Sequence, residues 1–328
     1  MRTATARLPG HPDHACELIA EAIVDEYARR DAEARIRLSV SGGRGLLFIA
    51  GDVLSQADFD VSAIAKRAAG SLGITEELEP FVSIEPVAAP QVAERRLACD
   101  TPVTVTGYAT SETQELIPLP AALARRVAKR LQEKRSNDPE WFWLGPDAEV
   151  TVQAEDSRPS HVIVSVEHGN EPLEIVRERV ATELASLFEN EKLEVNPTGP
   201  REQRGLAGQT GSSGRGVSPY GSLVPFNVST SGHDAMSVEK AGAWIARAAA
   251  LKIVRDGARA ALVQLVYNPG DENPIFILAK DERGRDCSSK LQKEDLNLAR
   301  VRDWLRPGLN YEAALWGFAG EAGLPWEA

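Results

Sequence analysis

Hydrophobic residues recur along the chain with two different periods. Between residues 14 and 30 they stand three or four positions apart, which predicts an amphipathic helix. The runs RIRLSV and LLFIAGDV alternate between apolar and polar residues and are joined by SGGRG, so they predict a β-hairpin. Residues 60–70 have helical spacing again. The first part of the chain is therefore expected to form a helix, a hairpin and a second helix.

The same order returns in the middle of the chain. LPAALARRVAKRLQEKR and EPLEIVRERVATELASLFEN have helical periodicity. Between them, EVTVQAE and HVIVSVEH alternate and are separated by a polar turn. A second unit of helix, hairpin and helix is expected here.

A third copy of this order is expected near the end of the chain. SVEKAGAWIARAAALKIVRDG and QKEDLNLARVRDWL are predicted helices. They flank the strand-like runs AALVQLVYN and PIFILAK, which are joined by PGDEN. Each hairpin has one apolar face, and amphipathic helices are available to cover it.

The repeat predicts an α+β protein of three similar α-β-β-α units that share a centre. We place the units at residues 1–95, 96–190 and 191–328, the last with a glycine-rich loop. These boundaries are approximate, because strands can be exchanged between neighbouring units.

Composition and charge narrow the classes of protein. No apolar run approaches the roughly eighteen residues of a membrane span, and the N-terminus lacks the apolar stretch of a signal peptide, so a cytoplasmic protein is expected. The net charge of -11 without a basic stripe argues against nucleic acid as a partner. Cys16, Cys99 and Cys287 have neither a disulfide framework nor a metal-binding spacing.

Two connectors between the units carry polar residues suited to a binding site. The second contains Asp100 ahead of a Gly-Tyr-Ala-Thr turn. The third, residues 196–240, is rich in glycine and serine and includes Arg215. Glycine lets a backbone approach a ligand closely, and arginine offers a planar fork to phosphate oxygens. GQTGSSGRG is not a Walker A loop, and from this segment alone a flexible linker remains the alternative to a phosphate loop.

Six segments in matching order resemble the methionine adenosyltransferase family, also called S-adenosylmethionine synthetases. The resemblance covers nearly the whole chain. The segments are GHPDHACELIAEAIVDEY, ACDTPVTVTGYATSETQELIP, VNPTG, GSSGRG, SGH with SVEKAGAWIA, and GFAGEAGLPWE. The last resembles the bacterial branch of the family, whereas ACDTP and SSGRG are closer to the archaeal branch.

The resemblance implies a fold and a reaction. The fold is three α+β units around a pseudo-threefold axis, in agreement with the repeat. The reaction joins ATP and methionine into S-adenosylmethionine and releases phosphate and diphosphate, with Mg²⁺ as cofactor. The resemblance also implies a homodimer or a higher assembly, with active sites between subunits.

Residue roles carried over from the family centre on the first and fourth motifs. His11 is implied beside the bond that breaks between adenosyl carbon and triphosphate, and Asp13 on the magnesium ion. Such groups suit the chemistry, because negative charge grows on the leaving triphosphate. The alternative is a polar helix start with Asp13 as N-cap. Arg215 matches the phosphate-binding arginine; its alternative is a solvated loop residue.

The remaining implied site residues lie in the other motifs. Asp100 matches an aspartate near methionine and adenosine. Asp52 lies where the family has a glutamate that meets the methionine amino group. Asp234 and Lys240 fall in the segment that resembles Ser-Gly-Lys and its helix, and are assigned to substrate binding. His233 stands at the place of the phosphate-binding lysine.

The sequence also departs from the family pattern. Gln209 replaces an acidic metal-binding residue, Glu149 a lysine, and Gly216 another lysine. Histidine at position 233 is charged only in part near neutral pH, whereas lysine is a permanent cation. The potassium-site glutamate aligns near Ser39, so no potassium site is expected. The pocket is expected to carry fewer cations and metal ligands than in the family.

Three functions remain open on these residues. The first is an active but divergent methionine adenosyltransferase. The second is a related adenosyl-transferring enzyme that uses another nucleophile. The third is a non-catalytic family member that binds nucleotide or completes another subunit's site.

Overall fold

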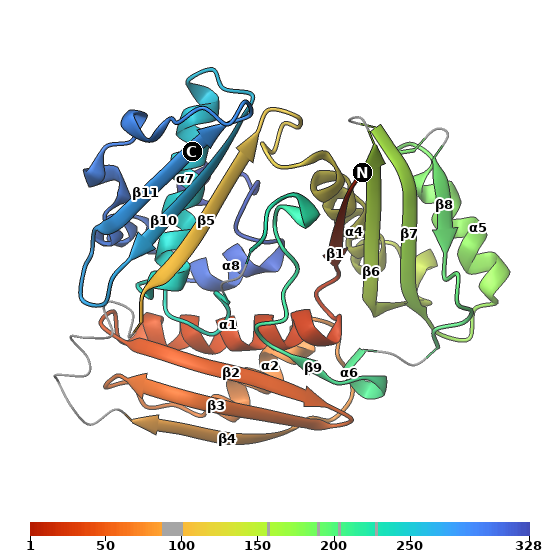
Figure 1. The fold of residues 1–328 in the computed structure, drawn as a ribbon. Coiled ribbons are helices and arrows are strands. Elements are labelled where there is room, and N and C mark those ends of the chain that lie inside the picture. Colours follow the sequence, from red (N-terminus) through yellow and green to blue (C-terminus); the bar gives the residue numbers. More distant parts are fainter. Residues whose placement is uncertain (87–100, 156–157, 189–190, 203–204, 227–228) are drawn as a thin grey trace.

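The fold consists of three β-sheets with helices packed on them (Figure 1). The computed structural model describes residues 1–328 except 87–100, 156–157, 189–190, 203–204 and 227–228. Helix α1 (Pro12–Arg30) lies near the middle of the molecule, between the lowest sheet of the view and helix α8 (Leu309–Leu315). The sheets supply the frame, and α1 joins them at the centre.

The first sheet has the strand order β4-β3-β2-β9. The predicted helices and hairpin are confirmed as α1, α2 (Val61–Ser71), β2 (Arg35–Gly43) and β3 (Leu46–Leu54). Strand β4 (Glu79–Pro86) was not predicted and runs parallel to β3. The fourth strand comes from far along the chain, because β9 (Gly211–Ser212) pairs with the edge of β2.

The second sheet has the order β1-β6-β7-β8 and takes its first strand from the N-terminus. Its predicted hairpin and helices are confirmed. The bounds of its elements are β1 (Arg2–Arg7), α4 (Leu119–Asn137), η1 (Pro139–Trp141), β6 (Leu144–Glu155), β7 (Arg158–His168), α5 (Leu173–Leu184) and β8 (Lys192–Val195). Strands β1 and β8 were not predicted. Because β1 leads directly into α1, the second sheet and the first helix are joined within one short segment.

The third sheet has the order β11-β10-β5. Helix α7 (Val238–Arg255) and the hairpin β10 (Ala260–Tyr267) and β11 (Pro274–Asp281) were predicted, whereas β5 (Val103–Thr110) had been assigned to a connector. Gly107 explains the close packing of β5 on α7. A β-carbon at Gly107 would lie 2.1 Å from the carbonyl oxygen of Ala246.

The predicted α-helix over residues 292–305 is wrong. The structure has two 3₁₀ helices there, η4 (Lys293–Leu296) and η5 (Leu298–Trp304). Asn297 separates them and caps the second with its side chain, which accepts a hydrogen bond from the backbone N–H of Ala299. The other short helices are α6 (Gly205–Gly208), η2 (Gly221–Leu223), η3 (Ser288–Lys290) and η6 (Pro325–Glu327).

Each sheet has its own hydrophobic core. The core of the first sheet is formed largely by α1 and α2 on β2 and β3, and Leu315 from the C-terminal part of the chain packs against it. Within the part of the chain that the structure describes, no helix is long and apolar enough to cross a membrane. The three cores leave a polar region where α1, β1 and the glycine-rich connector meet.

Candidate active site

The start of helix α1 is held by the glycine-rich connector. The backbone N–H of Ser212 donates to Asp13 Oδ1 at 3.0 Å. The alternative role of Asp13 as N-cap is wrong, because His11 occupies that position and no side chain caps the helix. A β-carbon at Gly211 would lie 2.1 Å from the carbonyl oxygen of Pro12. Only glycine permits this contact, so the first and fourth motifs of the sequence are packed together.

Arg7, at the end of β1, links three parts of this site. Its guanidinium lies 3.3 Å from Asp13 Oδ2, and its Nε donates to Glu149 Oε2 at 3.0 Å. Its Nη1 also donates to the backbone carbonyl of Arg215 at 2.9 Å. The carbonyl contact fixes the glycine-rich loop, while the side chain of Arg215 is exposed. Arg7 is therefore the cation that organises the residues around Asp13.

His11 is a neutral imidazole in this arrangement. Its Nε2 lies 3.7 Å from Glu149 Oε2, and its buried Nδ1 has no hydrogen-bond partner among the described residues. Burial lowers the pKa of His11 to about 3, and the nearby charges of Arg7, His14 and Arg201 lower it further. A neutral ring can donate one N–H to a ligand without itself carrying charge.

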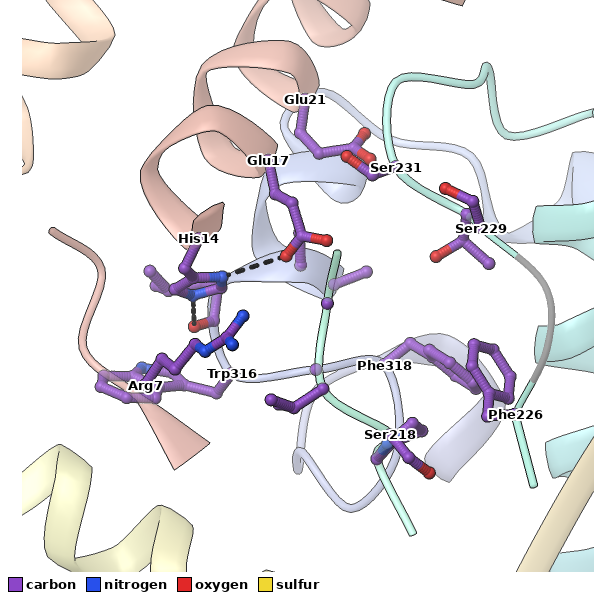
Figure 2. Close-up of a pocket in the computed structure, with 18 of the residues that line it drawn as sticks. Arg7, His14, Glu17, Glu21, Ser218, Phe226, Ser229, Ser231, Trp316 and Phe318 are labelled. Carbon is purple, nitrogen blue, oxygen red and sulfur yellow. Dashed lines mark hydrogen bonds and ion pairs between the residues drawn. The ribbon is translucent and has the colours of Figure 1, made fainter. Parts of the chain in front are cut away.

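A cavity of about 380 Å³ opens beside these residues (Figure 2). It lies between α1, the end of β1, the glycine-rich connector and the segment that follows α8. His14 ties two of these walls together, because its Nδ1 lies 3.3 Å from Glu17 Oε2 and its Nε2 lies 3.0 Å from the carbonyl oxygen of Leu315. Arg7 lines the cavity as well, so the cavity adjoins the His11 region.

Lys240 lines the cavity but is already paired. Its Nζ lies 2.7 Å from Glu21 Oε2 and 3.0 Å from Asn310 Oδ1. Both charged side chains are almost fully buried. Burial raises the pKa of Glu21 to about 7, against the lowering effect of Lys240. The pair joins α7, α1 and α8 at the centre of the molecule.

His233 and Asp234 pack against β2. The carboxylate of Asp234 accepts backbone hydrogen bonds from Ile36 and Met236, both at 2.9 Å. His233 Nδ1 lies 3.9 Å from Glu239 Oε2. Burial lowers the pKa of His233 to about 3, and nearby cations contribute to the shift. Neither residue is among the described residues that line the cavity.

The other two predicted substrate residues lie elsewhere. Asp52 is in β3, opposite Arg37 of β2 in the strand register, and is not part of the cavity wall as far as the structure describes it. Asp100 lies outside the described residues. The structure thus brings together His11, Asp13 and the backbone of Arg215, and it places Lys240 on the adjoining cavity.

Sequence reasoning missed three residues of this region. Arg7 and Leu315 carry no local signal, because their contacts are made only when distant segments meet. Glu17 had a signal, since it stands one helical turn after Asp13 and so lies on the same face of α1. A metal site is not formed by the protein alone: among the described residues, no three histidine, cysteine or acidic side chains are grouped to hold an ion.

Known proteins share the segments that build this site. Residues 1–88 match the family model for the N-terminal domain of S-adenosylmethionine synthetase, and residues 98–200 match the model for its central domain. The S-adenosylmethionine synthase of Thermus thermophilus is 30% identical over 379 residues, which cover 99% of this chain and 95% of that protein. The chain belongs to the S-adenosylmethionine synthetase family. The S-adenosylmethionine synthase of Aquifex aeolicus is 27% identical, over 100% of this chain and 96% of its own length.

Family membership identifies the three-unit α+β architecture as the S-adenosylmethionine synthetase fold. It also gives the departures from the family pattern a structural setting. Glu149, in place of a lysine, faces Arg7 and His11. This S-adenosylmethionine synthetase-family chain therefore has a carboxylate where a cation was expected.

Proposed function

We propose that this protein forms S-adenosylmethionine from ATP and methionine and releases phosphate and diphosphate. The observation that carries the proposal is the packing of the glycine-rich loop on the start of α1, through the 3.0 Å hydrogen bond from Ser212 to Asp13. Two motifs that are far apart in the sequence thereby form one polar site. The family's curated relatives in Thermus and Aquifex carry the name of this activity.

The reaction needs stabilisation of a leaving triphosphate. The thioether sulfur of methionine attacks the 5′ carbon of ATP, a carbon–sulfur bond forms, and the carbon–oxygen bond to the triphosphate breaks with its electron pair on oxygen. His11, neutral because burial and neighbouring cations lower its pKa to about 3, can donate an N–H to that oxygen. The exposed Arg215 and the N–H groups of the glycine-rich loop suit the phosphate oxygens.

Magnesium fits this site through one carboxylate. Mg²⁺ is commonly held by one or two carboxylates together with substrate phosphates, and Asp13 is such a carboxylate beside the glycine-rich loop. One oxygen of Asp13 is bound by the loop and the other faces Arg7, so phosphate must supply further ligands. When bound, the ion would neutralise charge on the phosphates.

A second candidate is an adenosyl-transferring enzyme with another nucleophile. The contact of Glu149 with Arg7 favours it, because this carboxylate partly neutralises a cation beside the proposed phosphate position. His233 adds to the case, since an imidazole with a pKa near 3 carries no charge at neutral pH. A non-catalytic nucleotide-binding protein would explain the same changes.

A nucleophile competition separates these candidates. The purified protein is incubated with ATP and Mg²⁺, together with methionine, homocysteine, cysteine and chloride in equal amounts, and the adenosyl products are resolved by mass spectrometry. The proposal expects the methionine sulfonium as the dominant product. An adenosyl product of another nucleophile would support the second candidate, and intact ATP would reject both enzymatic functions.

We also propose that the protein acts as a homodimer. The outer face of the first sheet exposes Leu46, Phe48 and Phe81, and the rings of Phe48 and Phe81 stack at 5.4 Å. Neighbouring exposed apolar side chains of this kind suit an interface between copies of the chain. Sedimentation at micromolar concentration tests this: a dimer is expected, and Phe48→Ser should shift the mass toward the monomer. A monomeric wild type would contradict the proposal.

A further inference from the structure

Glu17 presents a free carboxylate oxygen to the cavity. The side chain extends from α1 toward the glycine-rich loop, as Figure 2 shows. Its Oε2 lies 3.3 Å from His14, whereas no hydrogen bond to its Oε1 is found within the described part of the chain. The loop leaves room for it, because a β-carbon at Gly216 would lie only 2.7 Å from Oε1. A substituent at Gly216 would block this oxygen.

The cations around the cavity already have partners. Arg7 faces Asp13 and Glu149, and Lys240 is held by Glu21. The guanidinium of the third cation, Arg125, donates to the carbonyl of Ala319 and lies 3.4 Å from a carboxylate oxygen of Glu321. Paired cations attract an anion only weakly, so the interior of the cavity suits a positively charged group beside Glu17.

The far wall of the cavity is apolar. Phe226 and Phe318 lie with ring centroids 5.4 Å apart and line the cavity opposite Glu17 (Figure 2). Ser231 also lines it, and its buried hydroxyl has no partner among the residues that the structure describes. A ligand that combines a cationic head, a flexible apolar chain and a hydrogen-bonding group matches these walls.

We infer that Glu17 binds the ammonium group of an amino-acid substrate whose apolar side chain lies toward Phe226 and Phe318. This deepens the proposed function, on which it rests for the identity of the amino acid. Glu17 takes the task that the family resemblance gives to Asp52, which is not found on the described cavity wall. The ammonium would pair with Oε1, while Oε2 keeps its contact with His14.

Binding measurements on the full chain test this inference. Calorimetry compares L-methionine with the analogue in which a hydroxyl replaces the amino group, without ATP, for wild type and for Glu17→Gln. The amide keeps the size of the side chain and a contact to His14 but removes the charge. Glu178→Gln, at an exposed position of α5, is the matched control. Sulfonium formation is measured separately for each variant.

Wild type and Glu178→Gln should bind methionine about tenfold or more tighter than the hydroxyl analogue, since a charged pair is lost in the analogue. Glu17→Gln should bind both compounds alike. Equal preference in wild type and Glu17→Gln, or no methionine binding by any form, would overturn the inference. Sulfonium formation by a Glu17→Gln enzyme of unchanged preference would leave the proposed function standing, whereas Glu17-dependent binding without sulfonium would reject the function alone.

Discussion

The backbone N–H of Ser212 donates to the carboxylate of Asp13 at 3.0 Å across 199 residues of sequence. This hydrogen bond places the glycine-rich connector on the first turn of α1, where His11 and Arg7 also lie. The contact is specific in direction, because a charged acceptor strengthens the bond. The site therefore depends on the loop being seated on the helix.

Gly211→Ala should unseat the loop. The new β-carbon would lie 2.1 Å from the carbonyl oxygen of Pro12, a contact that forces the backbone to move. We expect a loss of about 1–3 kcal/mol in the free energy of unfolding and a larger relative loss of turnover. Urea denaturation and steady-state kinetics measure the two. Gly169→Ala, where nothing lies within 4 Å, is the control, and equal behaviour of the two variants would contradict the packing argument.

His11→Ala should slow turnover while nucleotide binding survives. If the imidazole donates to the leaving oxygen mainly in the transition state, its loss reduces kcat by about two orders of magnitude or more. His161→Ala, on β7 and beside Glu194, removes a histidine outside the site and should retain wild-type kinetics. An active enzyme whose kcat is unchanged by His11→Ala would exclude this role.

Stability should fall in mild acid because of His233. Its pKa is about 3 in the folded chain and near 6.5 when exposed, so between these values the unfolded state binds the extra proton. Stability present above pH 6.5 is then lost as the pH falls, by at most ~1.4 kcal/mol per pH unit for this group. His233→Asn should flatten the decline between pH 7 and 5, measured from urea midpoints. Parallel pH profiles for the two proteins would show that burial does not suppress protonation of His233.

The buried pair of Lys240 and Glu21 should be needed as a pair. Lys240→Met leaves the Glu21 carboxylate without its cation and should lower the free energy of unfolding by about 3–5 kcal/mol. Adding Glu21→Leu removes the unpaired group, and the double variant should regain much of that loss. Thermal unfolding of the three proteins measures this coupling; additive effects of the two substitutions would argue against it.

Local periodicity predicted much of the fold. Helices such as α1 and α7, and hairpins such as β6 with β7, have enough alternating or helical spacing to be identified from sequence. Strand β5 was missed because its run contains Gly107, which weakens a strand signal but permits close contact with Ala246. Strand β1 was missed because a strand so short is stabilised by a partner, β6, that the local sequence does not reveal.

The site could be predicted only in part for a similar reason. The resemblance of motifs identified His11 and Asp13, which the fold places on one short segment. The partners of Lys240 could not be predicted, because Glu21 and Asn310 meet it only through tertiary packing. Burial, which removes the charge of His233 at neutral pH, is likewise a property of the folded chain.

The central claim is that this chain transfers the adenosyl group of ATP to methionine and cleaves the triphosphate. The most direct measurement follows all products of one reaction mixture, with ATP, Mg²⁺ and methionine, by mass spectrometry and phosphate analysis. One sulfonium, one phosphate and one diphosphate should appear for each ATP consumed, and His11→Ala should slow all three together. Phosphate release from ATP without the sulfonium, or unchanged ATP after prolonged incubation of a folded protein that binds it, would contradict the claim.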